Sequence, residues 1–175
     1  MAKIPNLKLS ESEVSQTFDL KKILGVDLSD MPEVKDAIAQ ALIDRIVQRT
    51  ESGKDVEGNK FDSYSKEYKD STAFKAFGKT NKVNLTQTGD MLGLLNVIED
   101  KGNSIKIGWD DTTENAKAYN HQTGDTVKKR QFFGITAEEI KTISAEFKPD
   151  LKKSKNDEAI LSKLDKIAEF IANED

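Results

Sequence analysis

Apolar residues recur at helical spacing most clearly between Met31 and Arg49. They return at steps of three and four positions at Val34, Ile38, Ala41, Leu42 and Ile46, and Ile43 and Val47 widen the stripe. This stripe predicts a long helix with one broad buried face, for which a sheet is the simplest partner. Asp30 and Glu33 have the spacing of a capping box, and Pro32 is tolerated in the first turn. We therefore expect the helix to begin with Asp30 as its N-cap.

Alternation marks a β-hairpin over residues 95–109. Ile105, Ile107 and Trp109 are separated by single residues of a different character, which places them on one face of a strand. Gly102-Asn103 is a favourable two-residue turn between two such strands. The pattern therefore predicts an antiparallel pair with one buried face.

Weaker patterns stand near the N-terminus and after the hairpin. Leu7 and Leu9 alternate with polar neighbours and predict a short strand. Residues 14–24 contain apolar positions that suit either a strand or a short helix, and the pattern does not decide between them. Residues 127–133 are predicted to return as a strand.

Two short helices are predicted in the middle of the chain. Ser63 or Ser65 caps the first, which carries several aromatic residues and which Gly78 ends. Thr88-Gly89 precedes the second, and Asp90 supplies an acid at its positive end.

Two longer helices are predicted from capping boxes. Asp111–Glu114 opens the first, which ends near Gly124. Thr136–Glu139 opens the second, which is expected to reach Phe147 and to stop before Pro149.

Together these elements predict an α+β fold in which an antiparallel β-sheet packs against a long α-helix, with additional short helices and a C-terminal helix. Residues 1–29 are expected to form an N-terminal extension and residues 30–148 the α+β domain. Residues 149–175 comprise a lysine-rich linker and the C-terminal helix, which either packs on its own domain or reaches a neighbouring subunit. Its narrow apolar stripe consists of Ile160, Leu164, Ile167 and Ile171.

The composition indicates a small protein with a highly charged surface. Of its 175 residues, 36% are apolar and 33% are charged, and the net charge is −4. This balance gives no bulk attraction to DNA or to an anionic membrane. The absence of cysteine excludes disulfides, thiol catalysis and cysteine-ligated metals. Neither a signal peptide, nor a membrane span, nor a phosphate-binding loop is expected.

His121 is the only histidine of the chain. A catalytic triad or a zinc site needs convergent partners that the sequence does not supply at a recognisable spacing. The favoured interpretation is a structural histidine near a helix C-terminus, where a cation is stabilised. The alternative is a metal- or acid/base-dependent hydrolase or nuclease, in which His121 works with Asp110, Asp111 or Glu114.

Lys128-Lys129-Arg130 is a dense basic run that is predicted to lie at an interface. It suits contact with an acidic partner or with DNA phosphates, but strand alternation would split it between two faces, so a shared DNA-facing patch is the less favoured interpretation. Phe132 and Phe133 are expected in the core, and Gly134 is expected to allow a tight turn into the next helix.

Four segments follow one another between Gly58 and Ile140. They are Gly58-Asn59-Lys60-Phe61 leading to Ser65-Lys66-Glu67-Tyr68, then Leu85-Thr86-Gln87-Thr88-Gly89-Asp90-Met91-Leu92, then Ala118-Tyr119-Asn120-His121-Gln122-Thr123-Gly124, and finally Arg130-Gln131-Phe132-Phe133-Gly134-Ile135-Thr136. In this order they resemble the virion morphogenesis family of tailed phages, whose members act at the head–tail junction or complete the tail. The match spans close to half of the chain. Gln131 stands where many members have proline, Asn120 where an apolar residue is common, and the Phe61 region often carries a tryptophan.

The resemblance implies a non-enzymatic structural protein of the virion that needs no cofactor and no metal. It implies a ring of identical subunits, a hexamer or a dodecamer, through which genomic DNA passes without sequence-specific binding. The partners would be other neck, connector or tail proteins and no membrane, and assembly would take place in the host cytoplasm. Arg130 is expected to pair with a neighbouring subunit. The residues expected to hold the motif's structure are Thr88, Gly89, His121, Gln122, Gly124, Phe132, Phe133 and Gly134.

Overall fold

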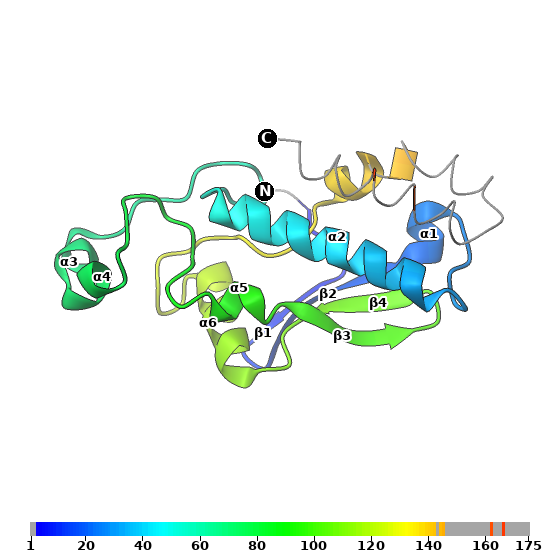
Figure 1. Cartoon of the computed structure of the whole chain (residues 1–175), viewed down its shortest axis with the longest axis horizontal. Coiled ribbons are helices and arrows are strands. Elements are labelled where there is room, and N and C mark those ends of the chain that lie inside the picture. Colours follow the sequence, from blue (N-terminus) through cyan, green and yellow to red (C-terminus); the bar gives the residue numbers. More distant parts are fainter. Residues whose placement is uncertain (1–2, 143, 146–161, 163–165, 167–175) are drawn as a thin grey trace.

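Four strands form an antiparallel sheet in the computed structural model, which describes residues 3–142, 144, 145, 162 and 166. The strands are β1 (Leu7–Ser10), β2 (Glu13–Asp19), β3 (Asn96–Lys101) and β4 (Ser104–Gly108), in the spatial order β1-β2-β4-β3. The helices are α1 (Leu20–Leu24), α2 (Pro32–Glu51), α3 (Lys66–Asp70), α4 (Thr72–Ala76), α5 (Asp90–Gly93) and α6 (Thr112–Thr123). Because α2 packs along the sheet, the predicted α+β class is confirmed (Figure 1).

The strands agree with the alternation of the sequence. β3 and β4 form the predicted hairpin around Gly102-Asn103, and the predicted N-terminal strand is present as β1. The undecided residues 14–24 divide between both possibilities, since β2 runs to Asp19 and α1 follows at once. The Asp19 carboxylate caps α1 by accepting a hydrogen bond from the backbone N–H of Lys22 at 3.0 Å. Residues 1–29 thus supply two strands of the sheet.

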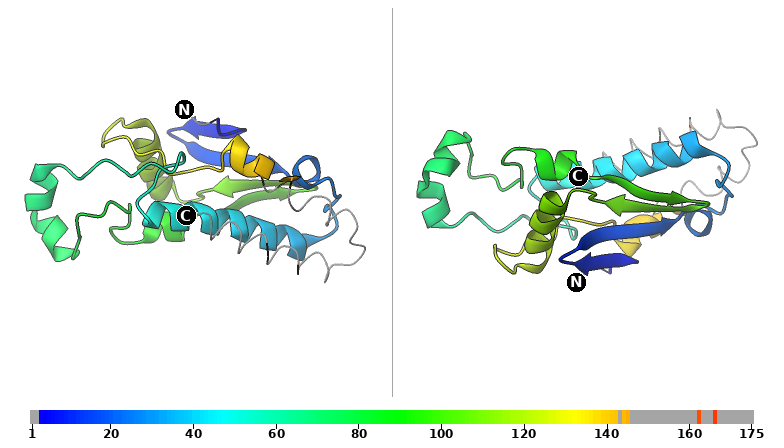
Figure 2. Two further views of the ribbon diagram at one scale, coloured as in Figure 1. Left: turned by 90° about the horizontal axis from the view of Figure 1, so that it is seen from above. Right: turned by 90° about the horizontal axis from the view of Figure 1, so that it is seen from below.

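The long helix α2 lies along one face of the sheet (Figures 1 and 2). Its buried apolar side chains include Val34, Ile38, Ala39, Leu42, Ile43 and Ile46. The predicted cap is wrong, because Met31 occupies the N-cap position and no side chain caps the helix there. Pro32 takes the first helical position, where its fixed φ and missing N–H cost nothing, and this places Met31 instead of Asp30 at the cap.

Aromatic rings fill the core beside the sheet. Phe132 and Phe133, predicted as core residues, are fully buried. The ring centroids of Trp109 and Phe133 lie 5.0 Å apart, and the indole N–H donates to the Met91 carbonyl at 2.6 Å. The only tryptophan of the chain is therefore a direct reporter of this packing.

The strand predicted over residues 127–133 is wrong, because residues 128–136 have no regular secondary structure. Side-chain amides make the backbone hydrogen bonds that a neighbouring strand would otherwise make. Gln122 donates to the Phe133 carbonyl at 3.2 Å and accepts from the Phe133 N–H at 3.0 Å. Gln16 does the same for Ile135, at 2.9 and 2.7 Å. Each glutamine satisfies both backbone groups of one residue, so the segment is buried without joining the sheet.

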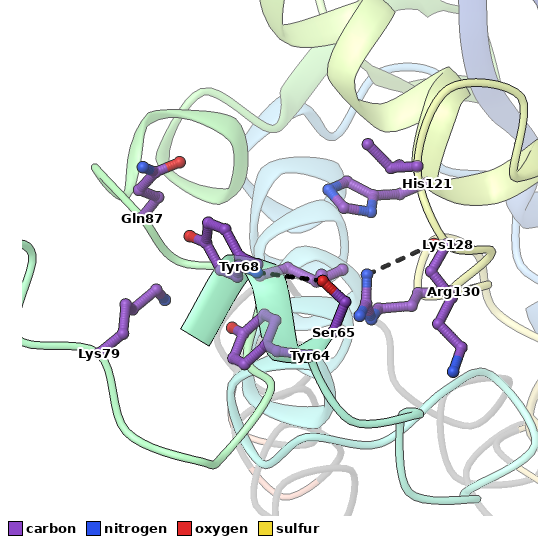
Figure 3. Close-up of a pocket in the computed structure, with 10 residues that line it drawn as sticks. Tyr64, Ser65, Tyr68, Lys79, Gln87, His121, Lys128 and Arg130 are labelled. Atoms are coloured by element: carbon purple, nitrogen blue, oxygen red, sulfur yellow. Dashed lines mark hydrogen bonds between the residues drawn. The ribbon is translucent and has the colours of Figure 1, made fainter. Parts of the chain in front are cut away.

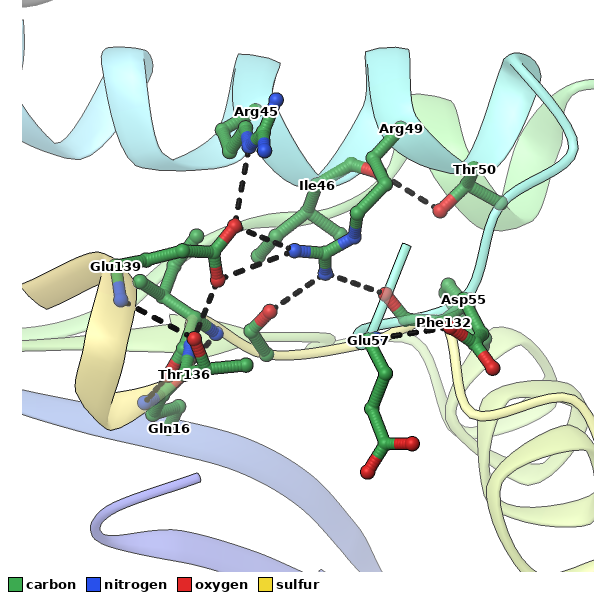
Figure 4. A network of polar contacts seen from close by, with 12 residues as sticks. Gln16, Arg45, Ile46, Arg49, Thr50, Asp55, Glu57, Phe132, Thr136 and Glu139 are labelled. Atoms are coloured by element: carbon green, nitrogen blue, oxygen red, sulfur yellow. Dashed lines mark hydrogen bonds and ion pairs between the residues drawn. The ribbon is translucent and has the colours of Figure 1, made fainter. Parts of the chain in front are cut away.

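A buried arginine completes this arrangement (Figure 4). Nη2 of Arg49 on α2 donates to the carbonyls of Phe132 and Gly134, at 3.0 and 2.6 Å. Its Nη1 pairs with Glu139 at 3.0 Å. Glu139 also closes the predicted capping box, because Thr136 N–H donates to its carboxylate at 2.8 Å while Thr136 Oγ1 accepts from the Glu139 N–H at 3.2 Å. The box and α2 are thus joined through one carboxylate.

The helix that follows this box is present over residues 137–142. Its predicted end at Phe147, the lysine-rich linker and the C-terminal helix lie outside the described residues. This applies to every position of the apolar stripe, namely Ile160, Leu164, Ile167 and Ile171.

Residues 62–82 form an arm that carries α3 and α4 and stands away from the sheet and α2 (Figures 1 and 2). The sequence predicts one helix here, and the structure has two. Ser65 caps α3, but Ser71 then leaves the helical conformation and caps α4 by accepting from the Phe74 N–H at 3.2 Å. No residue of α3 or α4 is buried.

Candidate functional site

A pocket of about 410 Å³ lies where the arm meets the C-terminal end of α6 (Figure 3). This volume falls in the range of small-ligand sites, roughly 300–1,000 Å³. No aspartate or glutamate is among its lining residues, which are Tyr64, Ser65, Tyr68, Lys79, Leu85, Gln87, His121, Val127, Lys128 and Arg130. The structure thus brings His121 together with two members of the predicted basic run.

Aromatic residues of the arm form one wall of the pocket. Tyr64, Tyr68 and Phe74 pack against one another at centroid distances of 5.2 to 5.6 Å, mostly edge to face. Burial raises the pKa of the Tyr64 phenol, which stays neutral at physiological pH. The wall therefore offers ring faces and hydroxyl groups without negative charge.

Arg130 is the charged group at the base of the pocket. Only 7% of its surface is exposed, and its guanidinium lies 5.5 Å from the centroid of the Tyr64 ring. Its Nη atoms donate long hydrogen bonds to the carbonyls of Lys128 at 3.4 Å and Asp62 at 3.3 Å. Burial lowers the pKa of Arg130, but an arginine keeps its charge in proteins.

His121 lies beside Arg130 in the last turn of α6. Burial, and to a lesser degree the charge of Arg130, lowers the pKa of His121 from 6.5 to about 4. The imidazole is therefore neutral at pH 7, and the expectation of a cation stabilised at the helix end is wrong because desolvation outweighs the helix dipole. Its Nδ1 is buried and has no hydrogen-bond partner among the described residues.

The lysines around the pocket differ in their surroundings. Lys79 donates to Asn84 Oδ1 at 2.9 Å and to the Thr86 carbonyl, and burial lowers its pKa. Lys128 is exposed at the rim and pairs with Asp62 at 3.1 Å. Lys129 is exposed and does not line the pocket. The three residues of the predicted basic run are therefore separated: Arg130 lies at the base of the pocket, Lys128 at its rim and Lys129 on the open surface.

The remaining motif residues shape the chain around the pocket. Gly124 ends α6 with φ of 79°, and a Cβ there would lie 2.8 Å from the Cβ of Lys129, so glycine is required for both reasons. Gln122 then holds Phe133, as described above. Gly89 takes φ of 92° before α5, and Thr88 Oγ1 accepts from the Asp90 N–H at 3.4 Å. These contacts are structural.

The carboxylates of the hydrolase hypothesis lie away from His121. Glu114 is seven residues earlier on α6, about 10 Å along the helix axis, and pairs with Lys117 at 2.6 Å. Asp111 caps the N-terminus of the same helix. Neither they nor Asp110 line the pocket. Within the described ranges, no group of three or more histidine, cysteine, aspartate or glutamate residues is placed to hold a metal ion.

Comparison with protein-family models, curated proteins and solved structures gave no match. As for membranes, none of the described helices combines the length and apolarity needed to cross a bilayer.

Sequence patterns did not indicate several residues that build the site. Tyr68 is predicted on a helix and lies on α3, whereas Tyr64, predicted on the same helix, precedes the cap Ser65, and nothing local places its ring against Arg130. Gln16 and Arg49 lie 119 and 85 positions from the Ile135 and Gly134 groups that they bind. Their polarity at otherwise apolar positions of β2 and α2 is the only signal in the sequence.

Proposed function

We propose that this chain is a structural protein of a tailed-phage virion at the head–tail junction, where copies assemble into a ring around the DNA channel. The proposal rests first on the four ordered segments that resemble the virion morphogenesis family. Within the fold, residues of the last three segments cap helices, turn the chain and fasten buried backbone. Such roles suit a protein that acts through shape.

The observation that carries the proposal is the arm. Isolated helices shorter than about 12 residues are marginal in water, yet α3 and α4 have five residues each and bury none of them. Tyr64 packs against the core and against Arg130, but Tyr68 and Phe74 are only partly buried, and 50% of the Phe77 surface is exposed at the end of α4. An arm of this kind is stabilised when another subunit covers it.

A ring provides such a cover through a heterologous contact, in which two different surfaces of each subunit meet. We propose the arm as one surface, together with Lys128 and Lys129 at its base. The apolar stripe of the C-terminal segment remains a second proposed contact. Tail completion, tail termination and neck connection are the specific roles that this assembly would serve.

The test compares Phe77→Ser with Leu94→Ser. Both residues are exposed apolar side chains, at 50% and 46%, but Leu94 lies at the end of α5 outside the arm. We expect Phe77→Ser to abolish ring formation in light scattering and incorporation into virions, while its thermal midpoint stays within about 2 °C of wild type. Leu94→Ser should leave assembly intact. A wild-type protein that is monomeric at all concentrations and absent from purified virions contradicts the proposal.

A further inference from the structure

Arg130 is a buried cation with no carboxylate within ion-pair distance among the described residues, and the Asp62 carboxylate acts on it only at longer range. Its contacts are two backbone carbonyls at 3.3 and 3.4 Å and the face of Tyr64, while the nearby Asp62 carboxylate is engaged by Lys128. Its Nε, like that of Arg49, has no hydrogen-bond partner among the described residues. A buried charge is normally paired, because desolvation without compensation is costly.

Arg49 provides an internal comparison. It is similarly buried, at 3% exposure, and also donates to two backbone carbonyls. Unlike Arg130, it pairs with a carboxylate, Glu139, at 3.0 Å. The two arginines differ further in their surroundings, since Arg130 alone lines the 410 Å³ pocket. The arginine that has no ion-paired carboxylate is therefore also the arginine that lines the pocket.

The lining of the pocket suits an anion that carries an apolar group. No acidic side chain lines it, and two lysines line it beside Arg130: Lys79, and Lys128, which is paired with Asp62 at the rim. Tyr64, Tyr68, Leu85 and Val127 supply apolar surface. The guanidinium is a planar donor that matches the geometry of a carboxylate.

We propose that this pocket binds a carboxylate attached to an apolar or aromatic group, and that Arg130 is its counter-ion. Two sources share this chemistry: an acidic residue of another polypeptide, next to an apolar side chain, and a small free organic acid. The proposal does not depend on the virion role, because it follows from the charge and shape of the pocket.

The first experiment titrates the full-length protein, labelled with ¹⁵N, with phenylacetate and with the peptide amide N-acetyl-Phe-Asp-NH₂. Phenylacetamide and N-acetyl-Phe-Asn-NH₂ are the matched neutral controls, and inorganic phosphate is tested as a third anion. We expect saturable shifts of pocket resonances with a carboxylate and none with its amide. Tighter binding of the peptide identifies a polypeptide source, and tighter binding of phenylacetate identifies a free acid. No saturable binding of either, or tighter binding of phosphate, overturns the proposal.

The second experiment removes the charge. Arg130→Met should weaken carboxylate binding roughly tenfold or more, the usual effect of losing a charge-assisted hydrogen bond. Lys129→Met, which removes the same charge from exposed surface outside the pocket, should change it less than about twofold. Without ligand, Arg130→Met should keep or raise the thermal midpoint, whereas Arg49→Met should lower it. An Arg130→Met protein that is destabilised as strongly as Arg49→Met would mean that Arg130 is already compensated within the chain, and the proposal would fail.

Discussion

Gln122 allows the sharpest test of how this fold is held together. Its side-chain amide bonds both backbone groups of Phe133, and only 1% of its surface is exposed. Gln122→Leu keeps approximately the same volume and removes both hydrogen bonds. The Phe133 N–H and carbonyl would then be buried without partners, since residues 128–136 have no neighbouring strand to accept them.

The expected loss follows from these two groups. Each buried backbone group left unsatisfied costs about 1–3 kcal/mol, and the added apolar surface of leucine offsets part of the sum. We therefore expect the free energy of unfolding to fall by about 2–4 kcal/mol. With a typical urea dependence, the midpoint would fall by about 1–2 M.

Urea unfolding followed by tryptophan fluorescence is the appropriate assay. Trp109, the only tryptophan, packs directly on Phe133 and reports on the region that is perturbed. Gln40→Leu is the matched control, because Gln40 is an exposed residue of α2 and its replacement should change stability by less than about 0.5 kcal/mol. If Gln122→Leu costs less than about 1 kcal/mol at an unchanged urea dependence, the amide does not replace a strand and the reasoning is refuted.

Three further predictions follow. Arg49→Met should cost about 2–4 kcal/mol in urea unfolding, because the carbonyls of Phe132 and Gly134 lose their buried donor while Glu139 keeps Arg45 at 3.1 Å; a loss below about 1 kcal/mol would contradict this. His121 is held neutral in the fold, with its pKa lowered to about 4, so its contribution is complete above pH 6.5 and is lost as the pH falls toward 4. Wild type should therefore lose about 2–3 kcal/mol more than His121→Gln over this interval in pH-dependent urea unfolding, and parallel curves would disprove the buried neutral state. Gly134→Ala should cost about 1–3 kcal/mol in thermal unfolding, since Gly134 has φ of 115° and a Cβ would lie 2.8 Å from Ile4 Cγ2. The control Gly93→Ala, at an open site with ordinary φ, should be neutral in the same assay.

Local chemistry explains where sequence reasoning succeeded. The hairpin at Gly102-Asn103, the caps at Asp111 and Thr136, and the helix ends at Gly78 and Gly124 depend on contacts within a few positions. Such contacts are encoded by residue type and spacing alone. The helix α2 was predicted for the same reason, although Pro32 moved its start by one residue relative to the expected cap.

The single strand prediction that failed marks the limit of this reasoning. Residues 127–133 are predicted to return as a strand after the helix that ends near Gly124, but a strand also needs a neighbouring backbone. Gln122 and Gln16 supply the hydrogen bonds instead, the latter from a position 119 residues away. No local pattern separates a segment bonded by side chains from one bonded by a ladder.

The sequence by itself determined the long helix α2, the helix α6, the hairpin and the α+β class, because periodicity and caps act over short distances. Only the tertiary structure decided which polar residues hydrogen-bond buried backbone groups and which line a pocket. Arg49 and Arg130 are both buried, yet one lies against Glu139 and the other lies beside Tyr64 of the arm. The physical reason is that a charge acquires its role from the groups that folding places around it, and these come from distant parts of the chain.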